Sequence, residues 1–279
     1  MKHPTLILSA ALCIVIASCG DDSSHPTTTT VSPTTITLAA STTATTMQAH
    51  PTSVDELVTA LYAALNAKDD EAFRALSAPG AHHAFFYDFG QSAGMFPAGF
   101  DHSASALSRA ATTLIEVIGD VIEFGDVLAI PVRYTHPNEV DIGYDVLIIE
   151  RSPDGLLIAG GATVYAAPGL EPDPTTADVV AAEIAAWNAG DAAAVMALMD
   201  AVATMWDDLG DPESKHRGAA LELFVNSSLW FQVEVDGELS YSGPFAVAPT
   251  RLTTATDSSE GITLYLVREG QIILQGYAS

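Results

Sequence analysis

The chain has 279 residues, of which 35 are acidic and 10 are basic, giving a formal net charge of −25 at pH 7. This charge repels nucleic acid and anionic lipid head groups, so we expect no nucleic-acid partner. Hydrophobic residues make up 48% of the chain, which is typical of globular material.

Residues 1–19 predict a lipoprotein signal peptide. Lys2 supplies a positive charge, and residues 6–17 form an apolar run that is too short to span a bilayer. The run ends in Ile16-Ala17-Ser18-Cys19, which resembles the bacterial lipobox. The resemblance implies that Cys19 is lipidated and anchors an extracytoplasmic protein to the cell membrane. The alternative is an ordinary secretory signal in which Cys19 is incidental.

Cysteine and histidine usage limits the chemistry of the mature chain. Cys13 would leave with the signal and Cys19 would carry the lipid, so the folded part has no thiol. It therefore cannot use a disulfide, a thiolate metal ligand or a cysteine nucleophile. Pairs of histidines at the helical spacing of metal ligands are also absent from the sequence, and we predict neither a metal site nor a cofactor.

Residues 20–52 predict a disordered stalk rich in threonine, proline and serine. Twelve threonines lie between Thr27 and Thr52. Such a segment buries too little apolar surface to offset the entropy of ordering. We expect it to hold the folded part about 30 Å from the membrane. O-glycosylation of the threonines and a bare spacer remain alternatives.

Order is expected to begin at Ser53. The sequence Ser53-Val54-Asp55-Glu56 matches a capping box, and apolar residues then follow at helical spacing. The pattern breaks at Asn66-Ala67-Lys68-Asp69, where Asp69 is a suitable N-cap for a second, short helix. Ala78-Pro79-Gly80 is expected to end that helix. The apolar stripe of the first helix consists of Val54, Leu57, Val58, Leu61, Tyr62 and Leu65.

The same order of features recurs later in the chain. A second helical stripe breaks at Asn188-Ala189-Gly190-Asp191, and another short helix follows. Further helical stretches are expected over residues 104–118 and 218–226. Each copy ends in a predicted hairpin, with turns at residues 151–155 and 268–270 that contain a glycine. The second stripe consists of Val179, Val180, Glu183, Ile184 and Trp187.

These matches predict an internal repeat of about 110 residues in two copies. We place the first domain at residues 53–167, a linker rich in proline at 168–174 and the second domain at 175–279. A coincidence of generic helix and hairpin patterns is the alternative.

A helix pair followed mostly by strands favours an α+β fold. The helix breaks at Asn66 and Asn188, together with the two closing hairpins, resemble the NTF2-like or SnoaL-like family. The resemblance implies two tandem cone-like NTF2-like domains, in which helices pack on a curved antiparallel sheet and leave an apolar pocket. The family includes isomerases, cyclases and hydrolases as well as non-catalytic binding modules, so the fold alone does not select a function.

An isomerase of this kind needs a carboxylate base in an apolar pocket and donors for the developing oxyanion. In the first domain Asp88 is the candidate base, because its aromatic neighbours would raise its pKa by desolvation. Tyr87, His83 and Tyr134 are candidate residues of the ligand pocket. A turn aspartate with surface histidines is the alternative.

In the second domain Asp207 is the candidate base. Trp206, Tyr241 and Tyr265 are the candidate pocket residues, although Tyr241 and Tyr265 also fit core positions with a polar tip. The matched motif positions do not supply a complete set of base and oxyanion donors in either domain.

We therefore favour a lipid-anchored binding or interaction module for a small apolar or amphipathic ligand. One alternative is a SnoaL-like isomerase, cyclase or hydrolase, which predicts a buried carboxylate of shifted pKa beside a tyrosine or histidine. Another is a structural cell-envelope protein in which the two domains form an intramolecular pseudo-dimer. That alternative predicts filled cones and a large apolar face between the domains.

Overall fold

The structure is a computed structural model that describes residues 50–87, 94–97, 114–135, 142–166, 169–206, 214–228 and 231–279. The predicted signal peptide, Cys19 and residues 20–49 of the predicted stalk lie outside these ranges. Within the described ranges, no helix is both long enough and apolar enough to cross a membrane.

In the described residues of the first half of the chain, which we call the first unit, two helices accompany one sheet. The strand order in its sheet is β2-β1-β7-β6-β5-β3, and β4 pairs with β5. Its elements are α1 (Val54–Ala67), α2 (Asp70–Ala75), β1 (Ser77–Tyr87), β2 (Gly94–Pro97), β3 (Leu114–Val117), β4 (Ile122–Phe124), β5 (Val127–Thr135), β6 (Ile142–Ser152) and β7 (Gly155–Ala166).

The second half, the second unit, repeats this plan. The strand order in its sheet is β10-β12-β13-β14-β8-β9, and β11 pairs with β12. Its elements are α4 (Thr176–Ala189), α5 (Ala192–Leu198), β8 (Met199–Trp206), β9 (Lys215–Arg217), α6 (Ala219–Ser228), β10 (Gln232–Val235), β11 (Ser240–Ser242), β12 (Phe245–Thr253), β13 (Ser258–Arg268) and β14 (Gln271–Ala278).

The predicted α+β architecture is confirmed, and it is the one that the NTF2-like resemblance implies, but the sheets are mixed rather than antiparallel. In each unit, the strand that follows the helix pair lies parallel to the last strand of that unit: β1 pairs with β7, and β8 pairs with β14. The other strand pairs are antiparallel. Local sequence patterns show only the hairpins, so the long-range parallel pairs escaped prediction.

Helix starts follow the capping pattern of the sequence. Ser53 accepts a hydrogen bond from the Glu56 amide at 3.3 Å, and the Glu56 carboxylate accepts from the Thr52 amide and hydroxyl as well as from the Ser53 backbone. Asp69 and Asp191 cap the second helix of each pair through equivalent bonds of 3.0 Å. The expected helix over 104–118 is wrong where it can be checked, because Leu114–Val117 forms β3.

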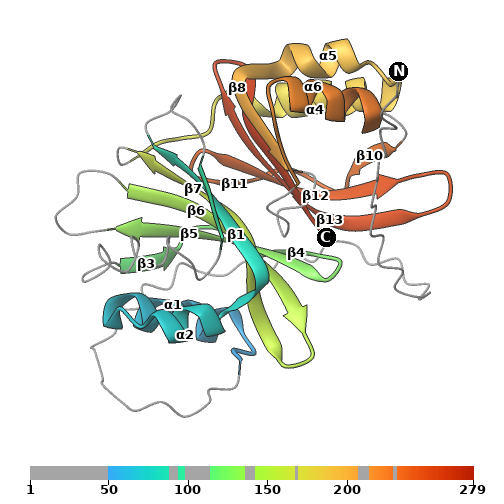
Figure 1. The fold of residues 1–279 in the computed structure, drawn as a ribbon. Coiled ribbons are helices and arrows are strands. Elements are labelled where there is room, and N and C mark those ends of the chain that lie inside the picture. The colour runs from blue at the N-terminus through green and yellow to red at the C-terminus, as the bar shows by residue number, and fades with distance from the viewer. Residues whose placement is uncertain are drawn as a thin grey trace, which may run out of the picture.

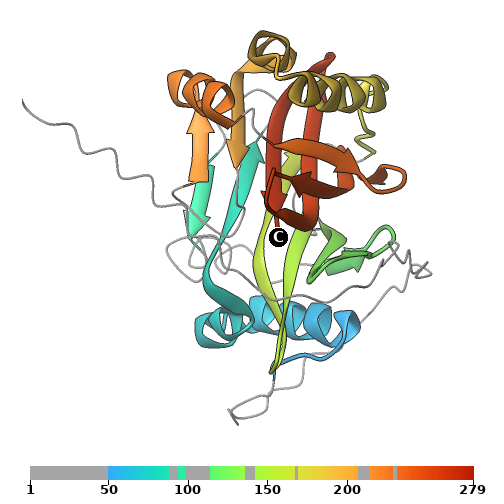
Figure 2. The same ribbon diagram turned by 90° about the vertical axis from the view of Figure 1, so that its right-hand side faces the viewer.

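The two units pack with their sheets face to face and their helices outside, giving four layers (Figures 1 and 2). Successive side chains of each strand point to opposite faces of the sheet. On β5, Leu128 and Ile130 pack in the cluster that includes α1, whereas Val127 and Ala129 pack in a cluster between the sheets. A third cluster joins α4 and α6 to the second sheet.

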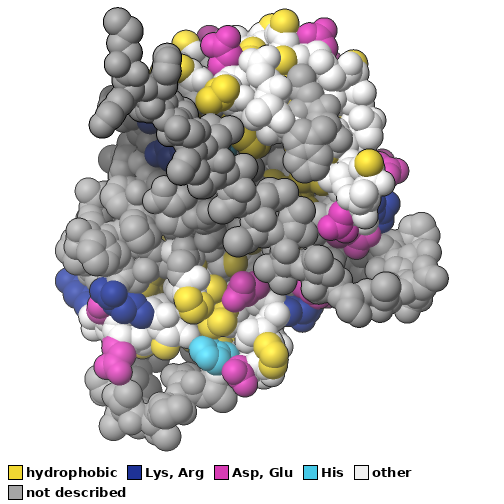
Figure 3. Space-filling model, turned by 45° about the vertical axis from the view of Figure 1, so that its right-hand side comes forward, with side chains coloured by type: hydrophobic (Ala, Val, Ile, Leu, Met, Phe, Trp, Pro, Cys, Tyr) yellow, Lys and Arg dark blue, Asp and Glu magenta, His cyan; other side chains and the backbone are white. Residues whose placement is uncertain are grey.

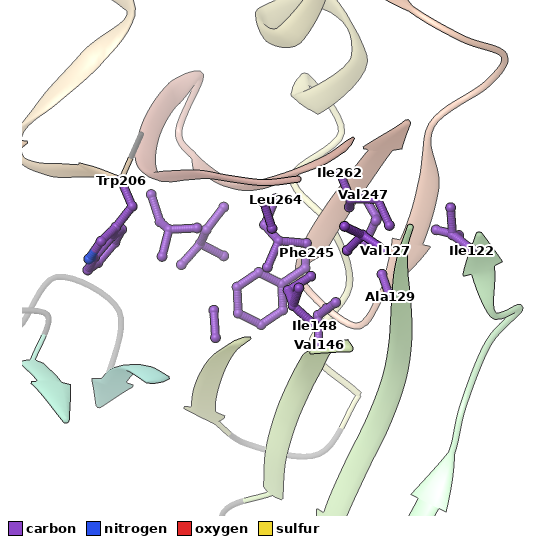
Figure 4. Packing of buried hydrophobic residues seen from close by; sticks show 14 of the residues in the cluster. Ile122, Val127, Ala129, Val146, Ile148, Trp206, Phe245, Val247, Ile262 and Leu264 are labelled. Carbon is purple, nitrogen blue, oxygen red and sulfur yellow. The ribbon is translucent and has the colours of Figure 1, made fainter. Parts of the chain in front are cut away.

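The cluster between the sheets is apolar and continuous. Phe245 and Leu264 are fully buried in it, and Figure 4 shows the Phe245 ring beside Val146 and Ile148 of the opposite sheet. Acidic side chains on the face drawn in Figure 3 are scattered over both units rather than gathered in one patch. This distribution fits a role for the charge in solubility.

Candidate functional site

The first unit holds a buried carboxylate in the middle of its sheet. Asp145, on β6, is 2% exposed and pairs in register with Val132 of β5 and Thr163 of β7. Strand alternation places it on the same face as Leu147 and Ile149, which pack with the helices. Burying a carboxylate on an apolar face is costly unless it accepts hydrogen bonds, so this aspartate needs a specific set of partners.

Hydroxyl groups supply these partners. The Thr163 hydroxyl donates to Oδ2 of Asp145 at 2.9 Å. The half-buried Tyr134 donates its phenolic proton to the same carboxylate. Burial, followed by the negative charge of Asp145, raises the pKa of Tyr134 well above its usual value. Tyr134 therefore remains a protonated donor throughout the physiological pH range.

Two tyrosines flank a glycine beside this carboxylate. Gly143 pairs with Tyr134 on one side and with Tyr165 on the other. A Cβ at Gly143 would lie 3.2 Å from the Tyr165 ring and 3.3 Å from Tyr134 Cβ, so both aromatic side chains lie directly over the glycine. Tyr165 is also half-buried. The result is a carboxylate surrounded by hydroxyl donors and aromatic rings on the helix-facing side of the sheet.

Two further predicted pocket residues share this part of the sheet. For His83 and Tyr87 the structure describes the backbone, which places them on β1 in register with Gly161 and Tyr165. His83 and Tyr87 are thus separated from the strand of Asp145 by β7, whereas Tyr134 lies on the adjoining strand β5. The predicted bases Asp88 and Asp207 lie outside the described residues.

The second unit holds a different buried carboxylate, contributed by a helix. Glu183 of α4 is fully buried, and Trp187, Tyr265 and Gln275 all donate to it. The Tyr265 hydroxyl is 3.2 Å from Oε2, and the Gln275 amide is 3.1 Å from Oε1. Burial raises the pKa of Glu183 to about 7. The hydrogen bonds from Trp187, Gln275 and Tyr265 lower the pKa, but their effect is smaller than that of burial.

The two units use equivalent positions differently. Leu61 precedes Asn66 by five positions, as Glu183 precedes Asn188. Counted back from the last residue of β6 and of β13, Ile149 matches Tyr265. Leu61 and Ile149 belong to the apolar core of the first unit, so a polar cluster in one unit replaces plain aliphatic packing in the other.

The same count matches Asp145 with Gly261. A Cβ at Gly261 would lie 2.1 Å from the Ala278 carbonyl oxygen and 2.8 Å from the Tyr277 ring. Protein atoms therefore fill in the second unit the space next to the Asp145 position of the first. The Tyr277 hydroxyl is in turn 2.9 Å from the Ser259 hydroxyl.

The remaining predicted pocket residues lie elsewhere. Trp206 is 1% exposed in the cluster between the sheets, on the face turned away from the helices, and Tyr241 is 44% exposed on β11. Tyr265 is buried against Glu183. Sequence reasoning missed Asp145 and Glu183 as site residues. Their signal was a carboxylate at a position where the strand or helix pattern requires an apolar residue.

The described residues do not bring together three or more histidine, cysteine or acidic side chains that could hold a metal ion. Asp145 and Glu183 are surrounded by hydroxyl, indole and amide donors, which suit a hydrogen-bonded carboxylate. The chemistry that these groups can offer is hydrogen bonding and proton transfer.

No family model and no curated protein matches the chain. Similar solved structures include an NTF2-like protein of unknown function from Cytophaga hutchinsonii, with 17% identity over 38% of this chain and 89% of that chain and a TM-score of 0.33. Another, from Mesorhizobium loti, has 20% identity over 39% and 95%, with a TM-score of 0.34. A third, from Silicibacter pomeroyi, has 13% identity over 40% and 92%, with a TM-score of 0.35. These similarities assign no activity to this chain.

Proposed function

We propose that this protein is a lipid-anchored, extracytoplasmic binding protein, and that its first unit holds a small, largely apolar ligand at Asp145. The second unit packs against the face of the first sheet that is turned away from Asp145 and supports that sheet. The observation that carries the proposal is the buried Asp145 carboxylate, which shares one sheet face with Tyr134 and Thr163.

The chemistry of this cluster defines the ligand. A carboxylate accepts hydrogen bonds and donates none, so the ligand group that Asp145 would recognise is an N–H or O–H. The neighbouring rings of Tyr134 and Tyr165 offer apolar area and a polar tip. A ligand with a ring body and a single hydrogen-bond donor fits these groups, whereas an anion would be repelled by Asp145 and by the net charge.

The contrast between the units supports placing the ligand in the first. In the second unit, Trp187 and Tyr265 are buried around Glu183, and Tyr277 occupies the space at Gly261. These features favour a supporting role for that unit, as does the apolar cluster that joins the sheets. The structural alternative thus accounts for the second unit and leaves the Asp145 cluster of the first unexplained.

A SnoaL-like isomerase, cyclase or hydrolase is the second candidate function. The hydrogen-bonded pair of Asp145 and Tyr134 favours it, because a carboxylate and a hydroxyl donor side by side are the groups that proton transfer at a carbon acid requires. The binding function predicts unchanged ligand after incubation, and the enzymatic one predicts turnover that Asp145→Asn abolishes.

The binding site is tested with two fluorescent probes that share one skeleton. N-phenyl-1-naphthylamine has an apolar body and one N–H donor, and 1-anilinonaphthalene-8-sulfonate adds a negative charge to it. We expect the uncharged probe to bind the mature protein with a fluorescence increase and the sulfonate to bind much more weakly. Equal binding of both would contradict recognition by a carboxylate.

Matched tyrosine variants locate the probe. Tyr134→Phe and Tyr265→Phe each remove a hydroxyl that donates to a buried carboxylate, one in each unit. We expect Tyr134→Phe to lower the affinity for the uncharged probe by roughly fivefold, which corresponds to the free energy of about one hydrogen bond. Tyr265→Phe is expected to leave the affinity unchanged. The reverse order would move the site to the second unit.

The anchor has a separate test. In a bacterial host, Cys19→Ala is expected to leave the signal uncleaved and the chain without lipid. Globomycin, which inhibits the signal peptidase that acts after lipid attachment, is expected to leave the signal on a chain that carries the diacylglycerol group. Mass spectrometry measures both. A wild-type chain whose mass does not include a diacylglycerol group would refute the anchor without bearing on the ligand site.

A further inference from the structure

Adjacent residues of β6 face opposite sides of the first sheet. Asp145 lies on the helix side, and Tyr144 faces the second unit, where it is 5% exposed. The Tyr144 ring lies against Gly243, between β11 and β12, where a Cβ would be 2.3 Å from Cδ1 and 2.7 Å from Cγ of the ring. Gly243 also has a φ of +52°, so both space and backbone conformation require glycine.

Two polar contacts reach the same residues of β6. The amide of Gly169, in the segment that joins the units, donates to the Tyr144 hydroxyl at 2.8 Å. The Ser242 hydroxyl donates to the backbone carbonyl of Asp145 at 3.5 Å, a long hydrogen bond. The second unit and the joining segment thus hold the strand at the residue that carries the site carboxylate.

We infer that Tyr144 is a positioning residue through which the second unit fixes Asp145 in the ligand site of the first. This inference rests on the proposed function. Neighbouring residues of a strand are coupled, because the hydrogen-bonded ladder restrains the φ and ψ angles between them. A shift of Tyr144 is therefore passed to the Asp145 carboxylate, whose 2.9 Å hydrogen bond from Thr163 depends on its position.

Reciprocity follows from this coupling. If the turn of the second unit sets the affinity of the first, ligand in the first unit must stabilise the turn by the same free energy. Binding should therefore slow hydrogen exchange at the amides of residues 240–245, although the ligand does not contact them.

A pair of glycine variants tests the inference. Gly243→Ala and Gly218→Ala both place alanine at a nearly equal left-handed φ, +52° and +53°, but a Cβ at Gly218 meets nothing within 4 Å. Backbone strain is thus matched, and only Gly243→Ala displaces Tyr144. We expect Gly243→Ala to lower the affinity for N-phenyl-1-naphthylamine about tenfold and Gly218→Ala to leave this affinity unchanged.

Tyr144→Phe is the second variant, used also if Gly243→Ala does not fold. It keeps the ring and loses the bond from Gly169, so we expect a loss of affinity of roughly threefold. The second readout is hydrogen exchange at residues 240–245 of the wild-type protein with and without saturating probe, which a purely structural contact would leave unchanged.

The outcomes separate this inference from the proposed function. If the wild type does not bind the probe, both are overturned. If the wild type binds it and Tyr134→Phe weakens it, the proposed function stands. In that case, equal affinities for the Tyr144 and Gly243 variants, the Gly218 variant and the wild type, with unchanged exchange at residues 240–245, would overturn the positioning role alone.

Discussion

Tyr265 of β13 donates its hydroxyl proton to the Glu183 carboxylate of α4 at 3.2 Å, and this bond joins a helix to the sheet in the interior of the second unit. Both residues are fully buried. Burial, followed by the charge of Glu183, raises the pKa of Tyr265 well above its usual value, so the phenol remains a donor while Glu183 changes protonation.

The first prediction concerns the pH dependence of stability. Because the pKa of Glu183 rises from 4.5 to about 7 on folding, the folded state holds this proton more tightly than the unfolded chain. The contribution of Glu183 to the free energy of unfolding should therefore fall by about 3 kcal/mol between pH 4.5 and pH 7 and stay level above that. Glu183→Gln should remove most of this slope.

Urea unfolding between pH 4.5 and pH 8 measures the slope. Glu222→Gln, at an exposed position of α6, is the control, because it removes one negative charge without altering the buried cluster. The same pH dependence in the Glu183 and Glu222 variants would show that Glu183 titrates normally.

The second prediction concerns the packing between the sheets. Phe245 is fully buried there, and truncation to alanine leaves a cavity that the opposite sheet cannot close. We expect Phe245→Ala to lower the free energy of unfolding by about 3–5 kcal/mol. Leu223→Ala, at a side chain that is 71% exposed, should cost less than about 0.5 kcal/mol. A small effect at Phe245 would indicate that the units do not hold this arrangement in solution.

The third prediction concerns the tie between α4 and β10. The Asn188 amide donates to the Val233 carbonyl at 2.8 Å, and its oxygen accepts from the Val233 amide at 2.7 Å. Asn188→Ala leaves both backbone groups without this partner, so we expect a loss of about 2–3 kcal/mol in thermal or urea unfolding. Asn226→Ala removes a donor to Glu222 of its own helix and should cost clearly less. Equal costs would count against the tie.

The fourth prediction concerns the filled space of the second unit. At Gly261 the backbone φ suits any residue, so the cost of Gly261→Ala comes from the clash with Ala278 and Tyr277. We expect a loss of about 3 kcal/mol, typical of overpacking. Gly190→Ala places a Cβ in open space at a φ of +67° and should cost about 1 kcal/mol, from backbone strain alone. Calorimetry of both variants decides whether space or strain dominates.

Local signals in the sequence predicted the helix pairs and their caps well. Ser53, Asp69 and Asp191 cap helices in the structure, and the hairpin turns lie next to Gly155 and Gly270. Each of these depends on residues within a few positions of one another. The pairing of β1 with β7 depends on residues far apart, and nothing in either strand specifies its direction.

Of the candidate site, the sequence indicated the place of Tyr134 on a strand, and its role in a ligand pocket stays a prediction. Asp145 itself lies inside a run, residues 144–150, that reads as β-branched and aliphatic, and Glu183 lies inside an apolar helical stripe. A buried carboxylate is recognisable only when its donors are known, and Thr163 and Gln275 reach these carboxylates from positions 18 and 92 residues away.

The parallel pairing within each sheet also constrains the order in which the chain can fold. His82 of β1 is in register with Gly160 of β7, and Thr204 of β8 with Leu274 of β14. In each unit this parallel pair can form only after the last strand has been made, and contacts between segments so far apart in the sequence form slowly. Each sheet is completed when its last strand enters between two parts that precede it in the chain, β7 between β1 and β6, and β14 between β13 and β8.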